Sequence, residues 1–593
     1  MFRQLLDPVG GSLGLSALCA ATPLFTLFVL LGVLRVKAWI AGLVSLGVAV
    51  VVAVAAFTMP VGQALLSASE GAAFGFFPIL WIVLNAIWVY NLTVETGHFD
   101  VLRRSFEKVS PDRRVQAITI AFCFGALLEA LAGFGTPVAI TVVMLMTLGF
   151  TPLKSAALAL IANTAPVAFG ALAAPIVTLA TVTSGAGAGA RLNVDTLGAM
   201  VGRQTPLLAA VVPLVLVFVA DGRRGLREAW KPALAAGVTF GVVQFAAANY
   251  VSVPLTDIMA ALLSAAVVVL VVRSGRERLP APAIPSARTA PAAERDVVGV
   301  TTVGAAGVTA DEERGGAPEP RGPRDPGGRV PEEGEVGRAR EPLPYTRAEV
   351  LRAYAPYLII IAMFVLANLA PVKKVLAKEP WTTSFPWPGL HVLSVGGKPV
   401  STTTFAFNWL PAAGTLLVIA GILSAVVLRI PARRALAAYG RTYAGLRWAI
   451  VCVMAVLALA YVMNLSGQTA SLGAFLARAG GFFPILAPIL GWIGVAVTGS
   501  DTSSNALFGA LQVQTAARAG LDPVLLAAAN SSGGVLGKMI SPQNLAIAAA
   551  AVGRAGHEGE LFRKVLGWSL ALLALMVVLV VLQSTPVLSW MVP

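Results

Sequence analysis

Long hydrophobic segments recur along the whole chain and are separated by short polar stretches. Most approach or reach the roughly 17–25 residues that an α-helix needs to cross a bilayer. Because these segments are continuously apolar rather than alternating, they predict membrane-spanning helices and not the strands of a barrel. The clearest are Leu13–Leu34, Ile40–Met59, Ala72–Tyr90, Pro206–Ala220, Ala233–Tyr250, Ile258–Val272, Tyr357–Ala370, Leu410–Leu428, Ile450–Val462 and Val565–Leu582.

Composition agrees with an all-α polytopic protein embedded in a lipid bilayer. Of the 593 residues, 57% are hydrophobic and only 12% are charged, whereas soluble domains carry about 25% charged residues. The net charge of +14 would suggest a nucleic-acid partner in a soluble protein. Here the basic residues fall between the hydrophobic segments, where they orient the spans, so we predict no nucleic-acid partner.

The positions of the basic residues predict the topology, because cytoplasmic loops of membrane proteins are enriched in Lys and Arg. Placing every basic cluster in the cytoplasm is self-consistent and puts both termini outside. The clusters are formed by Arg35, Lys37, Arg103, Arg104, Lys108, Arg113, Arg114, Arg223, Arg224, Arg227, Lys231, Arg429, Arg433, Arg434, Arg441, Arg447, Arg554, Arg563 and Lys564.

One long segment is polar throughout. Residues 273–346 are rich in Pro, Gly, Arg and Glu, as in "DEERGGAPEPRGPRDPGGRVPEEGE". Such a composition buries too little apolar surface to fold alone. We therefore predict a disordered cytoplasmic linker that joins two membrane regions, 1–272 and 347–593.

The two membrane regions share a sequence repeat. "NTAPVAFGALAAP" (Asn163–Pro175) and "NSSGGVLGKMISP" (Asn530–Pro542) agree at Asn, hydroxyl, Gly and Pro positions. Upstream, "AGFGTP" corresponds to "TGSDTS", and "YNLT" to "MNLS", in the same order. In the predicted topology Asn91 ends an inward-running helix and Asn464 an outward-running one. The copies are therefore inverted, as is typical of secondary transporters that bind substrate where broken helices meet.

Polar and glycine residues interrupt the hydrophobic segments at four corresponding places: Gly133–Pro137, Gly499–Asn505, Asn163–Pro166 and Asn530–Gly534. Irregular backbone at membrane depth survives only inside protein or beside a water-filled cavity, and exposed helix N-termini suit a carboxylate. The hydroxyls there suit a substrate hydroxyl or a cation, or they only cap helices. The predicted substrate-binding residues at these breaks are Thr136, Asn163, Thr164, Thr502, Ser503, Asn530, Ser531, Ser532 and Gly533.

Three ionisable residues lie within these hydrophobic surroundings: Glu129, Asp501 and Lys538. A charge at the centre of a membrane helix costs about 2.5–3.5 kcal/mol on insertion scales, so such residues usually pair or function. An apolar setting favours the uncharged form of Glu129, which suits a proton carrier, and Asp501 is the second candidate for that role. Lys538 either forms a structural ion pair with Asp501 or binds the substrate carboxylate.

Motifs of enzymes and ATP-driven pumps are missing from the sequence. It has no Walker lysine and no HExxH, and its three cysteines show no metal-ligand spacing. We therefore predict that the protein is not an enzyme and that it needs neither a cofactor nor a metal.

Several long motifs resemble the bacterial L-lactate permease family: "FCFGALLEALAGFGTPVAIT", "NTAPVAFGA", "MVGRQTP", "GWIGVAVTGSDTSSNALFGALQ" and "GGVLGKMISPQNLAIAAAAVG". The resemblance implies an inner-membrane symporter that carries lactate, glycolate or related 2-hydroxy acids together with protons. It also implies the architecture of the ion-transporter superfamily, with inverted repeats, re-entrant hairpins and elevator-type movement.

Two other classes of function stay open at this point. Clustered hydroxyls and carbonyls at helix breaks equally suit sodium, so a sodium-coupled carboxylate transporter is the first alternative. A carboxylate channel or sensor is the second, because polar breaks also occur in pores. The sequence also leaves open whether the chain forms a homo-oligomer.

Overall fold

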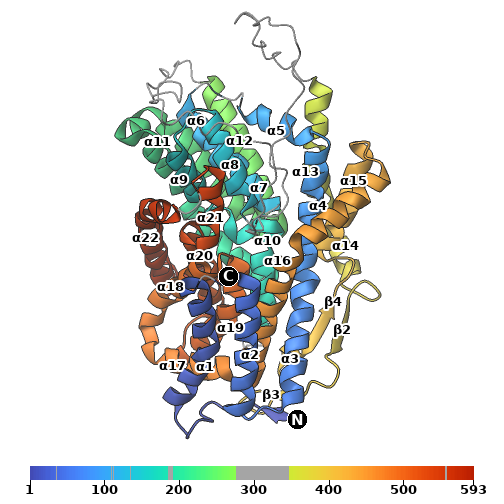
Figure 1. The fold of residues 1–593 in the computed structure, drawn as a ribbon, viewed down its shortest axis with the longest axis vertical. Helices are drawn as coiled ribbons and strands as arrows, with labels where there is room; N and C mark the ends of the chain where they lie inside the picture. The colour runs from blue at the N-terminus through green and yellow to red at the C-terminus, as the bar shows by residue number, and fades with distance from the viewer. Residues whose placement is uncertain are drawn as a thin grey trace, which may run out of the picture.

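The computed structural model of the chain describes residues 1–34, 36–107, 110, 112–131, 133, 135–184, 191–274, 346–554 and 557–593. The predicted linker, 273–346, lies almost wholly outside the described residues. Helices build nearly all of the described fold (Figure 1). Four short strands accompany them: β1 (Phe2–Arg3), β2 (Thr383–Pro386), β3 (Val392–Leu393) and β4 (Thr404–Phe407). β1 pairs with β3 in parallel, and β2 pairs with β4 antiparallel.

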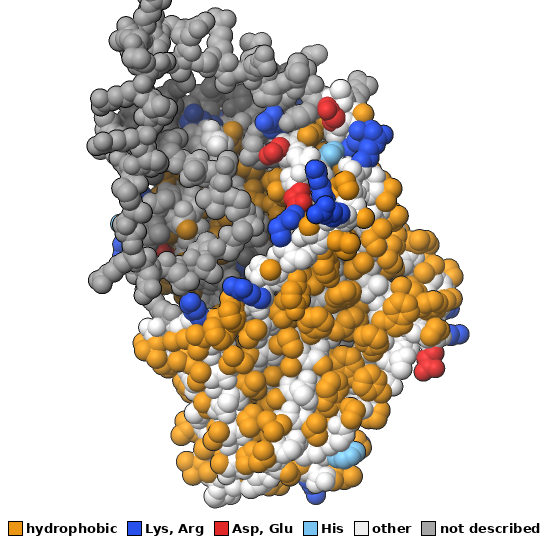
Figure 2. All heavy atoms as spheres, turned by 45° about the vertical axis from the view of Figure 1, so that its right-hand side comes forward, with side chains coloured by type: hydrophobic (Ala, Val, Ile, Leu, Met, Phe, Trp, Pro, Cys, Tyr) orange, Lys and Arg blue, Asp and Glu red, His pale blue; other side chains and the backbone are white. Residues whose placement is uncertain are grey.

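The described residues contain ten helical segments long and apolar enough to cross a membrane, or eleven if one bent pair counts as a single span. The prediction of a polytopic helical membrane protein is therefore confirmed. In Figure 2, hydrophobic side chains cover most of the described part of this face, and Lys and Arg gather toward its upper part. Such a broad apolar surface is suited to lipid rather than to water.

The described residues before the linker contain twelve α-helices. Their bounds are α1 (Leu13–Phe28), α2 (Ala38–Ala55), α3 (Val61–Phe74), α4 (Trp81–Glu95), α5 (His98–Glu107), α6 (Arg113–Gln116), α7 (Gly125–Leu131), α8 (Thr136–Thr147), α9 (Pro152–Ala162), α10 (Gly170–Thr183), α11 (Val194–Ala246) and α12 (Thr256–Ser274). The π-helical turn Ala117–Phe124 joins α6 to α7. α11 loses helical geometry at Asp221 and Gly222 and folds back, so that Gly237 packs against the carbonyl oxygen of Ala210.

In the described part of the region after the linker there are ten α-helices. Their bounds are α13 (Arg347–Asn368), α14 (Ala370–Leu376), α15 (Ala413–Val427), α16 (Ala432–Ser466), α17 (Gln468–Leu476), α18 (Phe483–Thr498), α19 (Asp501–Ala519), α20 (Pro523–Gly537), α21 (Pro542–Ala551) and α22 (Glu558–Gln583). Several of these helices begin with residues that are typical of helix N-termini. Asp522 accepts hydrogen bonds from the first amides of α20, and Ser541 caps α21, each just before a proline.

The first long helix of each repeat runs in the opposite direction to its counterpart. α3 and α4 pack along α16, so that Gly71 lies against the carbonyl oxygen of Leu457 while the Asn91 side chain donates to Thr442 Oγ1 at 2.7 Å. Residue numbers thus increase along α4 as they decrease along α16. The predicted inversion of the repeat holds for these helices.

Each repeat then forms a helical hairpin that turns back on itself. α7 packs against α8, with Gly133 and Gly135 between them at φ values of 54° and 81°. α18 packs against α19, joined at Gly499 with a φ of 76°. These left-handed conformations favour glycine. Each predicted range, Gly133–Pro137 and Gly499–Asn505, therefore contains a break, but both breaks are shorter than predicted: α8 already begins at Thr136 and α19 at Asp501.

A broken helix follows each hairpin. α9 and α10 are bent by 65° around the predicted break at Asn163–Pro166. In the second repeat the prediction of a break at Asn530–Gly534 is wrong, because α20 continues to Gly537 and the break lies at Lys538–Ser541. Gly533 serves packing instead: a Cβ there would overlap with the carbonyl oxygen of Pro488 in α18.

The close contact between α18 and α20 gives a stability prediction. Gly491 of α18 faces the Asn530 carbonyl oxygen so closely that a Cβ would overlap with it. Gly491→Ala is expected to lower the free energy of unfolding by about 1–3 kcal/mol, since rigid backbone must move. Thermal unfolding in detergent measures this. Gly47→Ala is the control, because no atom lies within 4 Å of its added Cβ; equal melting temperatures for both variants would contradict the prediction.

The N-terminal segment lies beside the end of α19. Leu6 and Asp7 line a cavity with Arg518 at the end of α19. Asp522, just beyond, pairs with Arg191 at 3.2 Å, and Arg191 donates to the carbonyl oxygen of the C-terminal residue Pro593. Figure 1 places α6, which carries predicted cytoplasmic arginines, at the opposite end from the N-terminus.

Candidate functional site

The breaks of the two repeats meet one another. Gly135, at the tip of the first hairpin, packs so closely on Ile547 of α21 that a Cβ would overlap with it. Gly499, at the tip of the second hairpin, packs in the same way on Gln543. Both hairpin tips therefore contact the helix that follows the second break. The two repeats together, rather than either one, form the candidate site.

A buried ion pair joins the repeats at this point. Lys538 Nζ lies 2.5 Å from Glu129 Oε1, and the two side chains are 8% and 3% exposed. The other carboxylate oxygen, Oε2 of Glu129, has no hydrogen-bond partner among the described residues. Of the roles predicted for Lys538, the ion pair with Asp501 is wrong: the fold gives Lys538 a carboxylate partner from the opposite repeat.

Two glycines leave room for the Glu129 side chain near the end of α7. A Cβ on Gly170 would lie 2.9 Å from Glu129 Oε1, and one on Gly133 would lie 3.8 Å from it. After Gly170 the chain makes a left-handed turn through Ala171–Ala173, whose φ values are 44°, 51° and 62°. Left-handed backbone costs roughly 1–2 kcal/mol per non-glycine residue. Such strain persists only where packing enforces it, and it gathers at functional sites.

Asp501 lies in the first turn of α19, directly after the second hairpin turn. Its Oδ2 accepts hydrogen bonds from Ser531 Oγ at 2.6 Å and from Asn505 Nδ2 at 3.4 Å, whereas Oδ1 has no partner in the described part of the chain. The helix N-terminus also favours a negative charge here. Two donors therefore engage one oxygen of Asp501 and leave the other oxygen without a partner in the described structure.

Buried amide side chains connect α19, α20 and α10. Asn530 Nδ2 donates to Asn505 Oδ1 at 2.9 Å, and Asn505 in turn donates to the Pro175 carbonyl at 3.1 Å. Gln512 Nε2 donates to Asn530 Oδ1 at 3.2 Å. Because protein groups engage both ends of its amide, Asn530 positions the helices around the site and has little left to offer a substrate.

The remaining predicted site residues fall into two groups. Asn163 and Ser532 are buried, and neither the Asn163 amide atoms nor Ser532 Oγ has a partner among the residues described. They are the candidates with free hydrogen-bonding capacity. Thr164 instead donates to the Ile161 carbonyl at 2.7 Å within its own helix turn. Thr502 and Ser503 are buried in the first turn of α19, and Thr136 is half-buried at the start of α8.

Two further buried acids were not identified from the sequence. Asp257, in the first turn of α12, is fully buried and accepts a hydrogen bond from Gln244 Nε2 at 2.9 Å. Glu70, in α3, is also fully buried, and neither carboxylate oxygen has a partner in the described structure. Both adjoin hydrophobic runs, so the signal that marked Glu129, an acid within apolar sequence, was available for them too.

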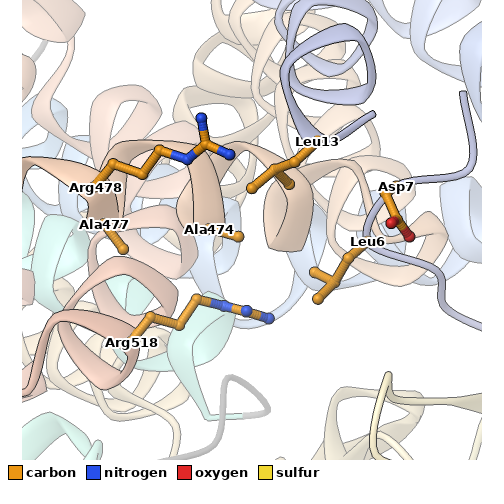
Figure 3. A pocket seen from close by; sticks show the side chains of 7 residues that line it. All are labelled: Leu6, Asp7, Leu13, Ala474, Ala477, Arg478 and Arg518. Atoms are coloured by element: carbon orange, nitrogen blue, oxygen red, sulfur yellow. The ribbon is translucent and has the colours of Figure 1, made fainter. Parts of the chain in front are cut away.

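A cavity of about 380 Å³ lies elsewhere, near the N-terminus (Figure 3). α1, α17, α19 and the N-terminal segment line it, and Arg478 and Arg518 extend toward its interior. None of the predicted site residues lines this cavity. We therefore assign the candidate site to the helix breaks, where the buried charges and unpartnered polar atoms are found.

Inverted repeats whose broken helices meet around buried charged and polar groups define the class of this protein: it is a secondary transporter. A family model described as L-lactate permease matches residues 16–282 and 329–587. The chain belongs to the L-lactate permease family.

Relatives match over their whole length. The glycolate permease GlcA of Escherichia coli (strain K12) is 39% identical, with 98% of each chain covered. The L-lactate permease of Bacillus subtilis (strain 168) is 37% identical, with 100% of each chain covered.

Solved structures are more distant. MtrF of Neisseria gonorrhoeae, described with a class of antimetabolite efflux pumps, has a TM-score of 0.44 at 14% identity over 87% of this chain and 82% of its own, too low a similarity to support the fold.

Proposed function

We propose that the protein carries L-lactate and related 2-hydroxymonocarboxylates such as glycolate across the membrane together with protons. The names of its relatives support the substrates. Proton coupling is supported mainly by the buried Glu129–Lys538 pair. One carboxylate oxygen of Glu129 in this pair has no partner in the described part of the chain. No enzymatic step is part of this proposal.

The proposed mechanism follows from charge balance at this pair. The substrate carboxylate takes the place of Glu129 on Lys538. Glu129 would then be a buried anion without a counter-ion, which costs several kcal/mol. It therefore takes up a proton, so that one anion and one proton bind together and the loaded carrier has the same net charge as the empty one.

The substrate hydroxyl needs a polar partner beside the carboxylate. Asn163 at the first break and Ser532 in α20, before the second break, retain unpartnered polar atoms in the described structure, so we assign the 2-hydroxyl to them. Asp501 is the weaker candidate for the proton, since Ser531 already stabilises its carboxylate form at 2.6 Å. A substrate lacking the hydroxyl would leave buried polar groups unpaired, which disfavours binding.

Topology and movement belong to the same proposal. We place the protein in the bacterial plasma membrane with both termini outside and the linker 273–346 in the cytoplasm between membrane regions 1–272 and 347–593. The positive-inside rule supports this orientation, because α6, which carries Arg113 and Arg114, lies at the opposite end from the N-terminus. Elevator-type movement of the two hairpins and broken helices would carry the site between the two sides.

Reconstituted liposomes test proton coupling. An inward gradient of one pH unit is expected to concentrate lactate about tenfold inside, since one proton moves with each anion and tenfold corresponds to about 1.4 kcal/mol. Exchanging sodium for choline at fixed pH should change nothing. Accumulation that follows sodium and ignores pH would establish the sodium-coupled alternative, and equilibration without accumulation under either gradient would indicate a channel.

A further inference from the structure

A second buried carboxyl group lies beside the first break, on an element that carries none of the residues assigned above. Asp257 is fully buried in the first turn of α12. Gln244 Nε2 donates to its Oδ1 at 2.9 Å and also contacts the Ala165 carbonyl in the break at 3.4 Å. Thr205 Oγ1 donates to Gln244 Oε1 at 3.0 Å and fixes the orientation of this amide. Gln244 therefore links the Asp257 side chain to the backbone of the first break.

Asp257 has no cationic partner among the described residues. Its Oδ2 atom is buried and unpartnered. The titratable group of the neighbouring helix α7 is Glu129, and α7 packs directly on α12. Arg203 of α11 points to Asn249 and the Met591 carbonyl instead. A buried carboxylate without a counter-ion is costly, which favours the protonated form of such a group.

Asp257 and Glu129 are anchored in the same way. Each has one oxygen held by a fixed donor, Gln244 in one case and Lys538 in the other. Each has a second oxygen that is buried and unpartnered in the part of the chain described. α7 and α12 pack directly on each other. Chains of buried acids of this kind carry protons in pumps and transporters.

We propose that Asp257 is a proton-relay residue that supplies the proton to Glu129 when substrate displaces Glu129 from Lys538. The O–H bond at Asp257 Oδ2 breaks as one forms at Glu129 Oε2, and the Asp257 carboxylate then regains a proton from the aqueous phase. This assignment rests on the proton-coupled transport proposed above. It makes Asp257 set the rate of proton loading, while Glu129 sets how many protons accompany each anion.

Asp257→Asn in proteoliposomes tests the relay. Asparagine keeps an oxygen that accepts from Gln244 but cannot pass a proton. Net uptake driven by a pH gradient is expected to begin about tenfold to a hundredfold more slowly, the size of effect that a lost proton-transfer group produces. Exchange of internal for external lactate needs no net proton transfer, so its rate should stay within twofold. The final accumulation ratio should equal that of the unmodified protein, and Asp257→Glu should recover part of the net rate.

Asp195→Asn is the matched control, because this acid is exposed and pairs with Lys373 at the surface. A net rate for Asp257→Asn equal to that of the unmodified protein would overturn the relay alone. Equal losses of net uptake and exchange, without rescue by Asp257→Glu, would overturn it in favour of a purely structural role. A final ratio near unity would show that Asp257 holds the transported proton itself, which also overturns it. An unmodified protein that ignores the pH gradient would reject the proposed function and the relay with it.

Discussion

Glu129→Gln is expected to abolish proton-driven accumulation while exchange of substrate across the membrane continues. Glutamine still accepts a hydrogen bond from Lys538, so the site keeps its geometry and its positive charge for the substrate carboxylate. It cannot gain or lose a proton, however. Under a gradient of one pH unit, the accumulation ratio should therefore fall from about tenfold to unity.

Two assays on one liposome preparation decide this: net uptake under the pH gradient, and counterflow of labelled lactate without a gradient. The matched control is Glu95→Gln, since Glu95 forms an ion pair with Arg441 that is largely exposed. A variant at Glu129 that still accumulates lactate tenfold would show that another group carries the proton, with Asp501 the next to test.

Lys538→Met should have the largest combined effect, removing transport and destabilising the fold. The substitution leaves Glu129 buried without its counter-ion, and breaking a buried pair in this way typically costs 3–5 kcal/mol. Substrate also loses its cationic partner. The double variant Glu129→Gln with Lys538→Met should regain most of the stability, because a neutral pair in the same volume needs no counter-ion, but it should not regain transport.

Thermal unfolding in detergent and uptake into liposomes, measured on the single and double variants, separate the two effects. Lys373→Met provides the control, because its contact with Asp195 is solvent-exposed and exposed pairs contribute at most about 1 kcal/mol. Full transport by the Lys538 variant would remove this residue from the substrate site. An additive loss of stability in the double variant would mean that the pair contributes little as a pair.

The continuous hydrophobic runs were enough to predict most of the spans and their order. It separated Pro206–Ala220 from Ala233–Tyr250, which the fold keeps as two arms of the bent helix α11. It missed two of the segments capable of spanning, Arg113–Leu131 and Gln468–Thr498. Both enter hairpins that are interrupted by glycine or hydroxyl residues, and such interruptions shorten the continuous apolar runs on which a hydropathy pattern depends.

The sequence predicted the charged residues of the candidate site but not which of them form the ion pair. Glu129, Asp501 and Lys538 stand out in sequence because charge is rare in hydrophobic segments. Which acid meets Lys538 depends on how the hairpin tips dock on α21, and no local pattern encodes that contact. The role of a glycine is ambiguous in sequence for a related reason. Gly533 suggested a helix break, yet in the fold it allows close packing against Pro488.

The separation of Glu129 from Lys538 along the chain affects how the protein is made. The two residues are 409 positions apart, so the acid enters the bilayer long before its lysine has been synthesised. At about 5–20 residues per second, the interval is roughly 20–80 s. During that time Glu129 lacks the cation that pairs with it, and the ion pair forms only once the C-terminal half has inserted beside it.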